Sequence, residues 1–470
     1  MSKTILAIDV GSTKISAVIA EMSDEGKLEV TGHGFAKSQG VKKGIITNIE
    51  LASRSIKKAL ADARRIAGNN ISLATISISN AYAKSLNSTG IVNIPHKDIS
   101  LKEINRVMET ALYNANIPNE YEVIHVLPYN FKVDDQDFIE DPYGMNASRM
   151  EVDVNIILTQ KSSLSNLTKA VRSAGLEIES IVLNSYASAI ATMNEDEKEL
   201  GVAVIDMGGQ SSNLIIHTGN SIRYNDFIPV GSNHITNDLS MALHTPLQVA
   251  EDVKIRYGNL IKQSGESIEL PVIGDEENHN TIPLEIVHSV IASRVEELLM
   301  LLEKSFTKSA LREQVGSGII LTGGMTKLKG LRELAQAIFH GLPVRIAHPR
   351  QLGGLFEELD DPAFSTVVGL LLYRTGEHTQ YEIDNARRLL HNKLEEGETE
   401  KGLGNIRLGS EHEREKEIPS DLFEGKTIKQ PKGKSEEKVD DHFSFDDLTQ
   451  PENDGRNAFN RVIDWAKQLF

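Results

Sequence analysis

TILAIDVGSTKISAVIA at residues 4–20 and GVAVIDMGGQSSNLIIH at residues 201–217 are built on one plan. In each stretch an apolar run ends in Ile-Asp, passes through a turn of small residues and continues into a second apolar run. Runs rich in β-branched residues, joined by a Gly-containing turn, are typical of a β-hairpin. The repeat therefore predicts two hairpins within a duplicated α/β architecture.

The two turns hold residues that suit a phosphate group. Glycine leaves backbone N–H groups accessible to an anion, and serine or threonine hydroxyls add donors. The candidate nucleotide-binding residues are Gly11, Ser12, Thr13 and Lys14 in the first turn and Gly208, Gly209, Gln210 and Ser211 in the second. Facing each other, such tips would hold a nucleotide triphosphate. An ordinary hairpin turn is the alternative for either copy alone, and a solvated strand lysine is the alternative for Lys14.

Each hairpin has an aspartate at the end of its first strand, Asp9 and Asp206. Magnesium keeps most of its water ligands in proteins and needs few direct carboxylate contacts. The pair therefore predicts Mg²⁺ held through water beside the phosphates. No cysteine is present, and the histidines lack ligand spacing, so neither a disulfide nor a cysteine-based zinc site is expected.

A third stretch follows the second hairpin. SGIILTGGMTKLKGLRELAQAIF, residues 317–339, predicts a strand, a tight turn at Gly323 and Gly324, and then an amphipathic helix. The N-terminus of a helix offers free N–H groups and the positive end of its dipole. A tight turn alone would explain the two glycines, but the position of this stretch after the second hairpin favours contact with a ligand.

Composition limits the class of protein. The 470 residues are 40% hydrophobic, enough for several domains, and the net charge is -17. This charge argues against nucleic-acid binding, which requires clustered Lys and Arg. The first residues contain no secretory apolar run, and later runs such as VVGLLLY are too short to span a bilayer. We therefore expect a cytoplasmic chain without a transmembrane segment.

The composition changes near residue 375. Residues 376–455 contain 21 Asp and Glu against 12 Lys and Arg, with only four aromatic residues. Such a segment cannot bury enough apolar surface to fold. A disordered acidic linker is expected there.

The chain ends on NAFNRVIDWAKQLF, residues 457–470. On a helix, Phe459, Val462, Ile463, Ala466, Leu469 and Phe470 fall in one arc of about 120°, with Trp465 at its edge and basic residues along its borders. This pattern is typical of a helix that lies in a membrane interface, although docking on the protein's own core is the alternative. The predicted anchor residues are Arg456, Phe459, Arg461, Val462, Ile463, Trp465, Ala466, Lys467, Leu469 and Phe470.

The hairpins and the Gly-Gly stretch resemble, in this order, the phosphate-1, phosphate-2 and adenosine motifs of the actin, Hsp70 and sugar-kinase superfamily. Along essentially its whole length, the chain is more specifically similar to the FtsA family of bacterial cell-division actin homologues. The stretches that carry this resemblance include DVGSTKI, KGIITNIE, HVLPYNFKVD, DPYGMNASRMEVDV, IPVGSNHITNDLSMAL, AEDVKIRYG, ILTGGMTKLKGL and STVVGLLLY.

The resemblance implies an α/β, actin-like, two-lobed ATPase fold with a family-specific α+β insertion. The sequence within that insertion is compatible, because strand-like runs flank a helix expected to open at Ser100 with Glu103 in a capping box. The implied ranges are 1–84, 162–190 and 350–375 for subdomain 1A, 85–161 for the inserted subdomain 1C, 191–232 and 312–349 for subdomain 2A, 233–311 for subdomain 2B, 376–455 for the linker and 456–470 for a membrane-targeting helix.

The resemblance also implies an ATP and Mg²⁺ site. By position, Asp9 and Asp206 match the magnesium-organising acids. The two turns match the phosphate loops, and Gly323, Gly324 and Met325 match the adenosine turn. Glu251 and Lys254 match a pair that lies near the ribose and adenine. From spacing alone, Glu251 and Lys254 form an i, i+3 pair that a solvated surface would explain equally.

Two departures from the superfamily's usual residues argue against efficient ATP hydrolysis. Gln210 adds bulk where the superfamily usually has a glycine. Asn184 occupies the place where several actin-like ATPases carry a water-activating glutamate, and an amide cannot deprotonate water. The hypothesis is that ATP acts mainly in structure and polymerisation, with slow or absent turnover.

The resemblance implies a tether in cell division, located on the cytoplasmic face of the cell membrane at the division site. Its implied partners are the C-terminal peptide of the tubulin-like FtsZ through subdomain 2B, further copies of itself in filaments, later division proteins through subdomain 1C, and an anionic membrane surface. The alternatives are a superfamily enzyme such as a sugar kinase, and a pilus-assembly or cell-shape actin homologue.

Overall fold

The computed structural model describes residues 3–23, 26–219, 221–261 and 265–391. All of them fall in the first of two units into which the chain divides, residues 1–408. Most of the expected linker and all of the expected C-terminal helix lie outside the described residues. Within the described residues, no helix is both long and apolar enough to cross a bilayer.

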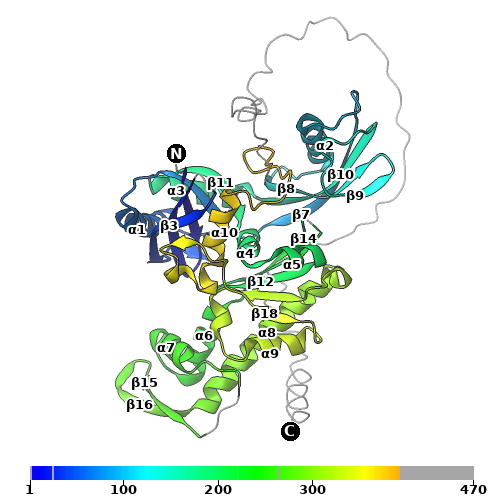
Figure 1. Ribbon diagram of the computed structural model, residues 1–470. Helices are drawn as coiled ribbons and strands as arrows, with labels where there is room; N and C mark the ends of the chain where they lie inside the picture. Colours follow the sequence, from blue (N-terminus) through cyan, green and yellow to red (C-terminus); the bar gives the residue numbers. More distant parts are fainter. Residues whose placement is uncertain (1–2, 24–25, 220, 262–264, 392–470) are drawn as a thin grey trace, which may run out of the picture. The chain divides into compact units, whose positions relative to one another are not determined.

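The first hairpin lies inside a six-stranded sheet (Figure 1). Its strands, in spatial order, are β11 (Glu177–Leu183), β6 (Leu73–Ile78), β1 (Lys3–Val10), β2 (Lys14–Met22), β3 (Leu28–Lys37) and β19 (Gly353–Gly354), with a separate small hairpin of β4 (Val41–Lys42) and β5 (Ile45–Ile46). The central strand β1 pairs antiparallel with β2 and parallel with β6. It is apolar on both faces because both faces are covered.

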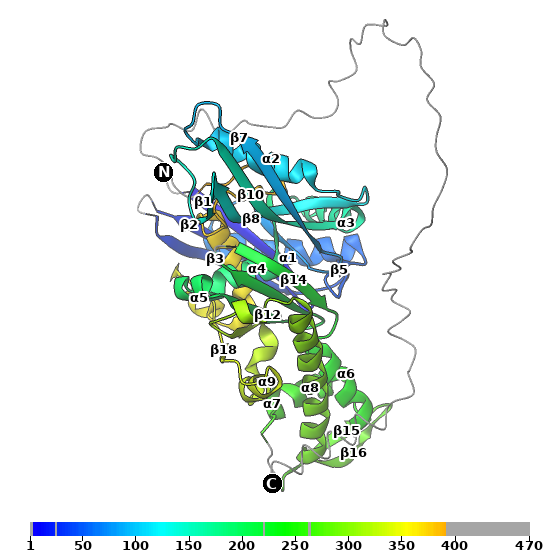
Figure 2. The same ribbon diagram turned by 90° about the vertical axis from the view of Figure 1, so that its right-hand side faces the viewer.

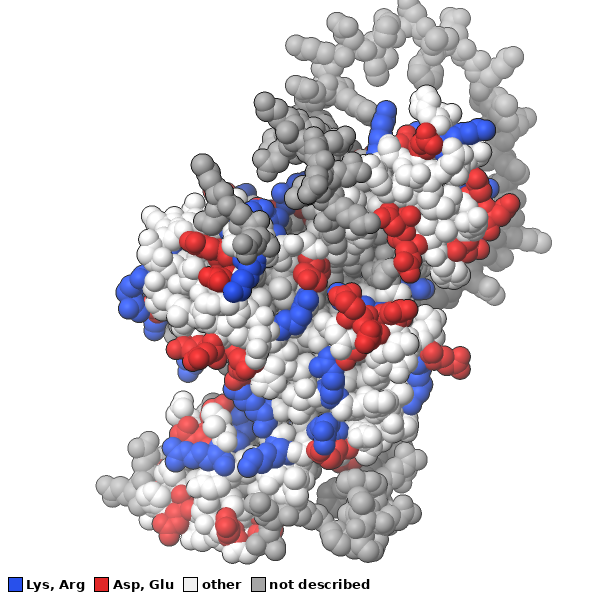
Figure 3. Space-filling view, viewed as in Figure 1, with Lys and Arg blue, Asp and Glu red and all other residues white. Residues whose placement is uncertain are grey.

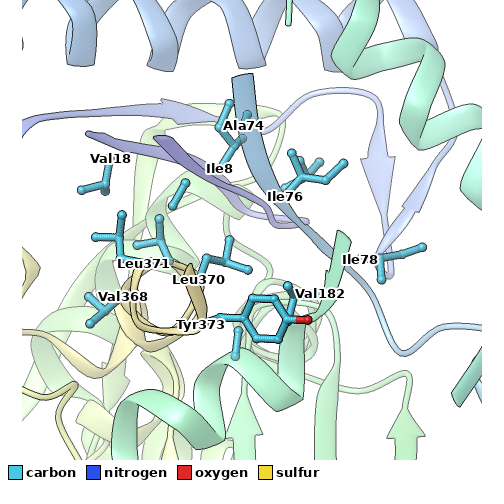
Figure 4. Close-up of a cluster of buried hydrophobic side chains, with 14 of the residues drawn as sticks. Ile8, Val18, Ala74, Ile76, Ile78, Val182, Val368, Leu370, Leu371 and Tyr373 are labelled. Carbon is cyan, nitrogen blue, oxygen red and sulfur yellow. The ribbon is translucent and has the colours of Figure 1, made fainter. Parts of the chain in front are cut away.

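Helices supply that cover. They are α1 (Ile49–Ala67), α3 (Lys161–Ser173), α4 (Asn184–Thr192) and α10 (Ser365–Arg374). α1 contacts α3 and the strands β2 and β3, while α10 contacts α4, β1 and β6. Figure 4 shows Leu370 and Leu371 of α10 beside Ile8 and Val18 of the sheet, and all four are buried. Burial of such side chains contributes about 25 cal/mol per Å² of apolar surface.

The second hairpin lies in a five-stranded sheet with the same pairing. The elements are β14 (Ser221–Ile228), β13 (Ser212–Thr218), β12 (Val202–Met207), β17 (Ile319–Thr322) and β18 (Val344–Ile346) in spatial order, with α5 (Glu195–Leu200), α9 (Leu331–Ile338) and a 3₁₀ helix η1 (Arg312–Gln314). β12 pairs antiparallel with β13 and parallel with β17, as β1 does with β2 and β6. Asp9 and Asp206 each precede the last residue of the central strand. The predicted duplication is confirmed.

A mainly helical group follows the second hairpin. It consists of α6 (Ser232–Leu243), α7 (Leu247–Tyr257), β15 (Ser267–Val272), β16 (Asp275–Pro283) and α8 (Leu284–Lys308). Figure 2 shows the three helices side by side, with the β15–β16 hairpin at their far end. The long helix α8 buries Val287, Ile291, Val295 and Leu298 at helical spacing against the core of the second lobe.

A separate four-stranded sheet is inserted after β6. Its elements are β7 (Lys84–Asn93), β10 (Arg149–Gln160), β8 (Tyr121–Val133) and β9 (Gln136–Ile139) in spatial order, with α2 (Leu101–Asn114). α2 opens with the predicted capping box, because Ser100 accepts from a backbone N–H and its own N–H donates to Glu103. Gly90 of β7 allows α2 to approach closely, since a Cβ there would lie 2.2 Å from the carbonyl oxygen of Val107.

The expected start of the linker at residue 376 is wrong. Residues 377–391, here called the C-terminal strap, pack between the inserted sheet and the first lobe. Ile383 exchanges two backbone hydrogen bonds with Val126 of β8, at 2.9 and 3.1 Å. Asn385 accepts a hydrogen bond from the backbone N–H of Ile181 in β11. The polar composition of the strap did not predict this packing, because the strap is held largely by side-chain hydrogen bonds.

Glu382 is the central contact of the strap. Its carboxylate is fully buried and accepts hydrogen bonds from Tyr186 and Tyr373, at 2.9 and 2.8 Å. Nδ1 of His125 lies 2.6 Å from the same carboxylate, and the backbone N–H of Leu183 donates to Nε2 of that ring. His125 is therefore the neutral tautomer that donates from Nδ1. The buried anion has three donors, which join the insertion, α4, α10 and the strap.

We expect the substitution Glu382→Gln to lower the free energy of unfolding by about 2–4 kcal/mol, because an amide replaces a charged acceptor and faces several donors with an N–H₂ group. Chemical denaturation of the full chain at neutral pH measures the change.

Glu50→Gln on α1 is the matched control, since Glu50 is 76% exposed and pairs only with Arg54 one turn away. It should change the stability by less than about 0.5 kcal/mol. Equal effects of the two substitutions would contradict a structural role for the strap.

Candidate functional site

The two hairpin tips and the Gly-Gly turn line one cleft between the lobes. The cleft contains about 950 Å³ of space, part of it open to solvent. Its lining residues are Asp9, Val10, Gly11, Ser12, Thr13, Lys14, Gly44, Ser79, Asn184, Asp206, Gly208, Gly209, Gln210, Ser211, Asn213, Ser232, Gly323, Gly324, Pro362, Ala363 and Thr366. The structure thus brings both predicted phosphate-binding turns together, although they are far apart in the sequence.

The hairpin tips touch each other. A Cβ on Gly209 would lie 1.8 Å from the hydroxyl oxygen of Thr13 and 3.0 Å from its Cβ, so the Thr13 side chain would have to move to admit one. The second tip is also tied to α6, because Ser232 and Asn233 donate their N–H groups to the carbonyl oxygens of Gly208 and Gly209, at 3.0 and 2.7 Å. The tip and the start of α6 therefore form one unit.

Gln210 bridges the lobes. Its side-chain oxygen accepts a hydrogen bond of 2.8 Å from the backbone N–H of Lys43, between β4 and β5. In the first lobe, the Ser12 hydroxyl accepts from the backbone N–H of Gly44 at 2.7 Å. The Gln210 side chain, which a glycine would lack, thus makes a contact across the cleft.

Asp9 enters the cleft from the end of β1. The Ser77 hydroxyl donates to its carboxylate at 2.8 Å and accepts from the backbone N–H of Val10 at 2.9 Å. Burial raises the pKa of Asp9 to about 6, although Ser77 and Lys14 oppose the shift, and the nearby Asp206 adds to it. A carboxylate held away from water without a cation is destabilised.

Asp206 has the equivalent position in the second lobe. Ser188 of α4 donates to its carboxylate at 2.7 Å, and Thr366 of α10 lies at 3.4 Å. Burial raises the pKa of Asp206, while these hydroxyls and Lys14 lower it. Two carboxylates whose pKa values are raised by burial, on facing strands, form a site that favours a cation.

The residues present fit Mg²⁺ and a nucleotide. Asn213, opposite Asp206 in the hairpin register, is buried at the cleft wall, and its side-chain oxygen has no hydrogen-bond partner among the described residues. Such an atom needs water or a ligand as a partner. The described residues contain no group of three His, Cys, Asp or Glu that could enclose a metal. The arrangement suits a hydrated Mg²⁺ held through water and phosphate oxygens.

Lys14 begins β2 and reaches back into the cleft. Its ammonium nitrogen lies 3.1 Å from the ring centroid of Phe364, a residue of the 3₁₀ helix η4 (Pro362–Phe364). Burial lowers the pKa of Lys14 to about 8, while Asp9, Asp361 and Asp206 raise it and Lys327 lowers it further. The lysine is therefore not a freely solvated strand residue.

Comparisons with known proteins identify the family. Residues 203–369 match the model of the family "Cell division protein FtsA", and residues 80–158 match "SHS2 domain inserted in FTSA". The cell division protein FtsA of Helicobacter pylori is 40% identical over 414 residues, covering 81% of this chain and 84% of that protein. The FtsA of Pseudomonas aeruginosa is 37% identical, covering 79% of this chain and 89% of that protein. The chain belongs to the FtsA family.

The actin-like fold expected from the resemblance is also confirmed, with an SHS2 domain as its insertion. Among solved structures, a type IV pilus biogenesis complex of PilM and PilN superposes with a TM-score of 0.57. It is 18% identical, and the match covers 79% of this chain and 98% of that one. At this identity the likeness concerns the fold alone.

The third motif of this FtsA-family chain departs from the predicted local structure. The helix after the strand does not begin at the Gly-Gly turn. A 3₁₀ helix, η2 (Gly324–Lys327), follows instead, and α9 begins only at Leu331. Gly323 has φ 91° and its N–H donates to the carbonyl oxygen of Pro362. The start of η2, whose first residue Gly324 lines the cleft, therefore takes the place of the amphipathic helix end expected there.

Three predicted site residues do not line the cleft. Met325 is buried beneath the Gly-Gly turn. Lys254 and Glu251 form an ion pair of 2.7 Å, and both contact the hydroxyl of Thr236 in α6. Lys254 also donates to the carbonyl oxygen of Ser232, which does line the cleft. The pair therefore supports the wall of the cleft from behind.

Sequence reasoning missed several polar residues that orient the two aspartates of this FtsA-family site. Ser77, Ser188 and Thr366 hold the carboxylates, and Asn213 faces the cleft. A signal exists for Ser77, because β6 lies next to β1 and its carboxyl end reaches the same edge of the sheet. Ser188 and Thr366 lie within apolar helices, where a small polar residue carries no such signal.

We expect Asp9→Asn to stabilise the protein in chelator and without nucleotide, by about 1–3 kcal/mol at pH 7.5. The folded-state pKa of about 6 lies above the ordinary value of 3.8, so ionisation of Asp9 costs stability as pH rises from about 4 to 6. Asparagine removes that cost and can still accept from Ser77.

Denaturation curves from pH 4 to 8 measure this effect, and the difference from wild type should shrink toward zero at the acid end. Asp62→Asn serves as control, because Asp62 lies on the surface of α1 with its side chain 42% exposed. A stability gain that stays constant with pH would contradict the assignment to Asp9 ionisation.

Proposed function

We propose that this FtsA-family protein is an ATP-binding scaffold that assembles with itself and tethers FtsZ to the cytoplasmic face of the membrane at the division site. The observation that carries the proposal is the cleft, in which two duplicated hairpin tips and two buried aspartates converge. Membership of the FtsA family supplies the role in cell division.

The cleft favours ATP over other ligands by its donor set. The tips offer backbone N–H groups, hydroxyls and the Lys14 ammonium to phosphates, and Gly324 leaves open space beside Pro362 and Ala363. Mg²⁺ would supply positive charge that neutralises the phosphates. Asp9 and Asp206 would hold its water ligands.

The cleft also favours slow or absent hydrolysis. Among the described lining residues, Asp9 and Asp206 are the only acids, and both are held by hydroxyl donors. Asn184 lines the cleft as an amide whose oxygen accepts from the N–H of Ser185. A sugar kinase needs a further acid at a substrate position. This arrangement makes a superfamily enzyme the weaker candidate.

We expect Gly324→Leu to abolish the rise in thermal midpoint that Mg·ATP produces in the wild type, and to weaken ATP affinity at least about tenfold. A Cβ on Gly324 would meet only the Cβ of Ala363, at 3.4 Å, so a longer side chain extends into the cleft without a clash in the backbone.

Gly324→Ala is the matched control. Its methyl group fits in ordinary contact and should leave ATP binding within about threefold of wild type. Thermal shift and equilibrium binding report both variants. Unchanged ATP binding by the leucine variant would contradict this placement of the nucleotide.

Membrane attachment is proposed for residues 456–470, from the sequence pattern alone. A helix of this length is marginal in water, and each basic residue near an anionic surface contributes about 1 kcal/mol. Several anchors on one polymer bind more tightly through their effective concentration. We therefore propose that attachment is reversible and increases with self-assembly into filaments.

The FtsZ contact is proposed for subdomain 2B, residues 233–311. A groove lies between α6 and α8, with Met241 69% exposed at one side. Arg294 on the other side is held by Asp238 through two hydrogen bonds, at 2.6 and 3.0 Å. Figure 3 shows acidic and basic side chains interspersed over the face in view. The groove combines apolar side chains of Met241, Ala242 and Val290 with the oriented cation Arg294, which also pairs with Glu297. This combination suits an extended peptide such as the FtsZ C-terminus.

Subdomain 1C, residues 85–161, is the proposed contact for later division proteins. Its outer elements carry Tyr113 on α2 and Phe138 on β9, which are 89% and 81% exposed. Large exposed apolar side chains favour a protein partner.

We expect the full chain with Mg·ATP to bring FtsZ down with anionic liposomes, and two changes to abolish this separately. Removal of residues 456–470 should abolish liposome binding of both proteins. Met241→Asp should leave the chain on liposomes and release FtsZ, with peptide affinity lowered at least about tenfold. Co-sedimentation and binding of the FtsZ C-terminal peptide measure the two losses.

Met300→Asp is the matched control for the groove, because Met300 is 51% exposed on α8 and does not line it. This variant should retain FtsZ. The emission of Trp465, the single tryptophan, should shift to the blue on anionic liposomes. Liposome binding that survives loss of residues 456–470 would contradict the anchor.

A further inference from the structure

The Lys14 ammonium has an unusual environment for a cation at the cleft. Its nitrogen lies 3.1 Å from the ring centroid of Phe364 and 6.0 Å from that of Phe35. The two rings lie 4.7 Å apart with an interplanar angle of 40°. Within the described residues, no carboxylate oxygen lies within 4 Å of this ammonium. The cation therefore rests on an aromatic surface.

The strand register explains why the Phe35 ring reaches Lys14. Ser16 of β2 pairs with Phe35 of β3, and Lys14 is two residues from Ser16, on the same face of the sheet. Phe35 is thus a diagonal neighbour of Lys14 across the two strands. Phe364 comes from η4, outside these strands, and its ring lies nearer to the ammonium than that of Phe35 does.

Phe364 is held firmly in place. Asp361 caps η4, because its side chain accepts from the N–H of Ala363 at 2.9 Å and its carbonyl oxygen accepts from the N–H of Phe364 at 2.8 Å. Asp361 also pairs with Lys327 of η2, beside the Gly-Gly turn. The ring next to Lys14 is therefore fixed to the same segment that supplies Pro362 and Ala363 to the cleft.

We propose that Phe364, backed by Phe35, is a positioning residue that holds the Lys14 ammonium at the cleft for the phosphate groups of the nucleotide. The negative face of an aromatic ring attracts a cation, more strongly where water is excluded. Unlike a carboxylate, the ring leaves the formal charge of the lysine available to an anion. This inference rests on the proposed nucleotide site and assigns a role within it.

An ion pair of Lys14 with Asp9 is the competing arrangement. Such a pair would cancel the charge that a phosphate needs and would occupy the carboxylate expected to organise Mg²⁺. The aromatic surface separates these tasks, since Asp9 is held by Ser77 and Lys14 by the rings. The charged groups that influence Lys14 are Asp9, Asp206, Asp361 and Lys327.

The test compares Phe364→Leu with Phe364→Tyr in the full chain. Leucine keeps apolar bulk without a ring, and tyrosine keeps the ring. We expect leucine to lower the affinity for ATP and ADP about tenfold, within the range of a desolvated cation–π contact. Adenosine affinity should stay the same, and tyrosine should restore ATP affinity.

Nuclear magnetic resonance of the nucleotide-free protein gives a second readout. The Lys14 ε-methylene protons of lysine-labelled protein, assigned with Lys14→Arg, should show an upfield ring-current shift. That shift should disappear in Phe364→Leu and remain in Phe364→Tyr. Phe364→Met provides a second ring-free variant of similar volume, with the same expectation, if leucine impairs folding.

The outcomes separate this inference from the proposed function. An unchanged Lys14 shift in both ring-free variants overturns the aromatic placement, whatever the nucleotide results. Equal losses for ATP and adenosine overturn the positioning role, because they indicate a general change in the cleft. Wild-type protein that binds no ATP refutes the proposed nucleotide site and with it the positioning role, while the resonance still decides whether Lys14 rests on Phe364.

Discussion

The contact between the two hairpin tips is the constraint on which the rest of the site depends. Gly209 comes so close to Thr13 that even a methyl group would displace the Thr13 side chain. This approach carries Asp9 and Asp206 into one cleft, where burial raises both pKa values. Burial of the two carboxylates therefore destabilises the site electrostatically in the ligand-free state. A cation and phosphates relieve that destabilisation, which gives ligand binding a means to influence how the lobes meet.

Small polar residues in the same cleft hold the two aspartates and connect the two lobes. Ser77, Ser188 and Thr366 come from three separate elements and each holds an aspartate in place. Gln210 ties the second tip to the first lobe through the Lys43 backbone. At the tips the lobes are thus linked by hydrogen bonds, while buried apolar residues of both lobes, such as Ile8 and Val204, belong to one cluster elsewhere. Such links can exchange with ligand contacts at low cost, which suits the ATP-binding scaffold that we propose.

The C-terminal strap, in contrast, is held by buried contacts that no ligand would replace. Tyr381 and Ile383 fill the core of the inserted sheet, and buried Glu382 collects donors from three other elements. Because an unpaired buried charge is so unfavourable, the strap, the insertion and the first lobe should keep one arrangement. Any downstream anchor would therefore act on the actin-like body through a firmly attached segment.

The sequence by itself determined the duplicated hairpins, the two aspartates, the turns of small residues and the α2 capping box, because each is a local pattern with a physical meaning. Tertiary structure decided the remainder. The strap has the composition of a linker, yet it packs because polar groups within it, such as Thr379 and Glu382, meet partners more than 190 residues away. Likewise Lys14 meets Phe364 only after β2 and η4 come together. Local pattern specifies elements, whereas partners distant in sequence specify which polar groups are buried.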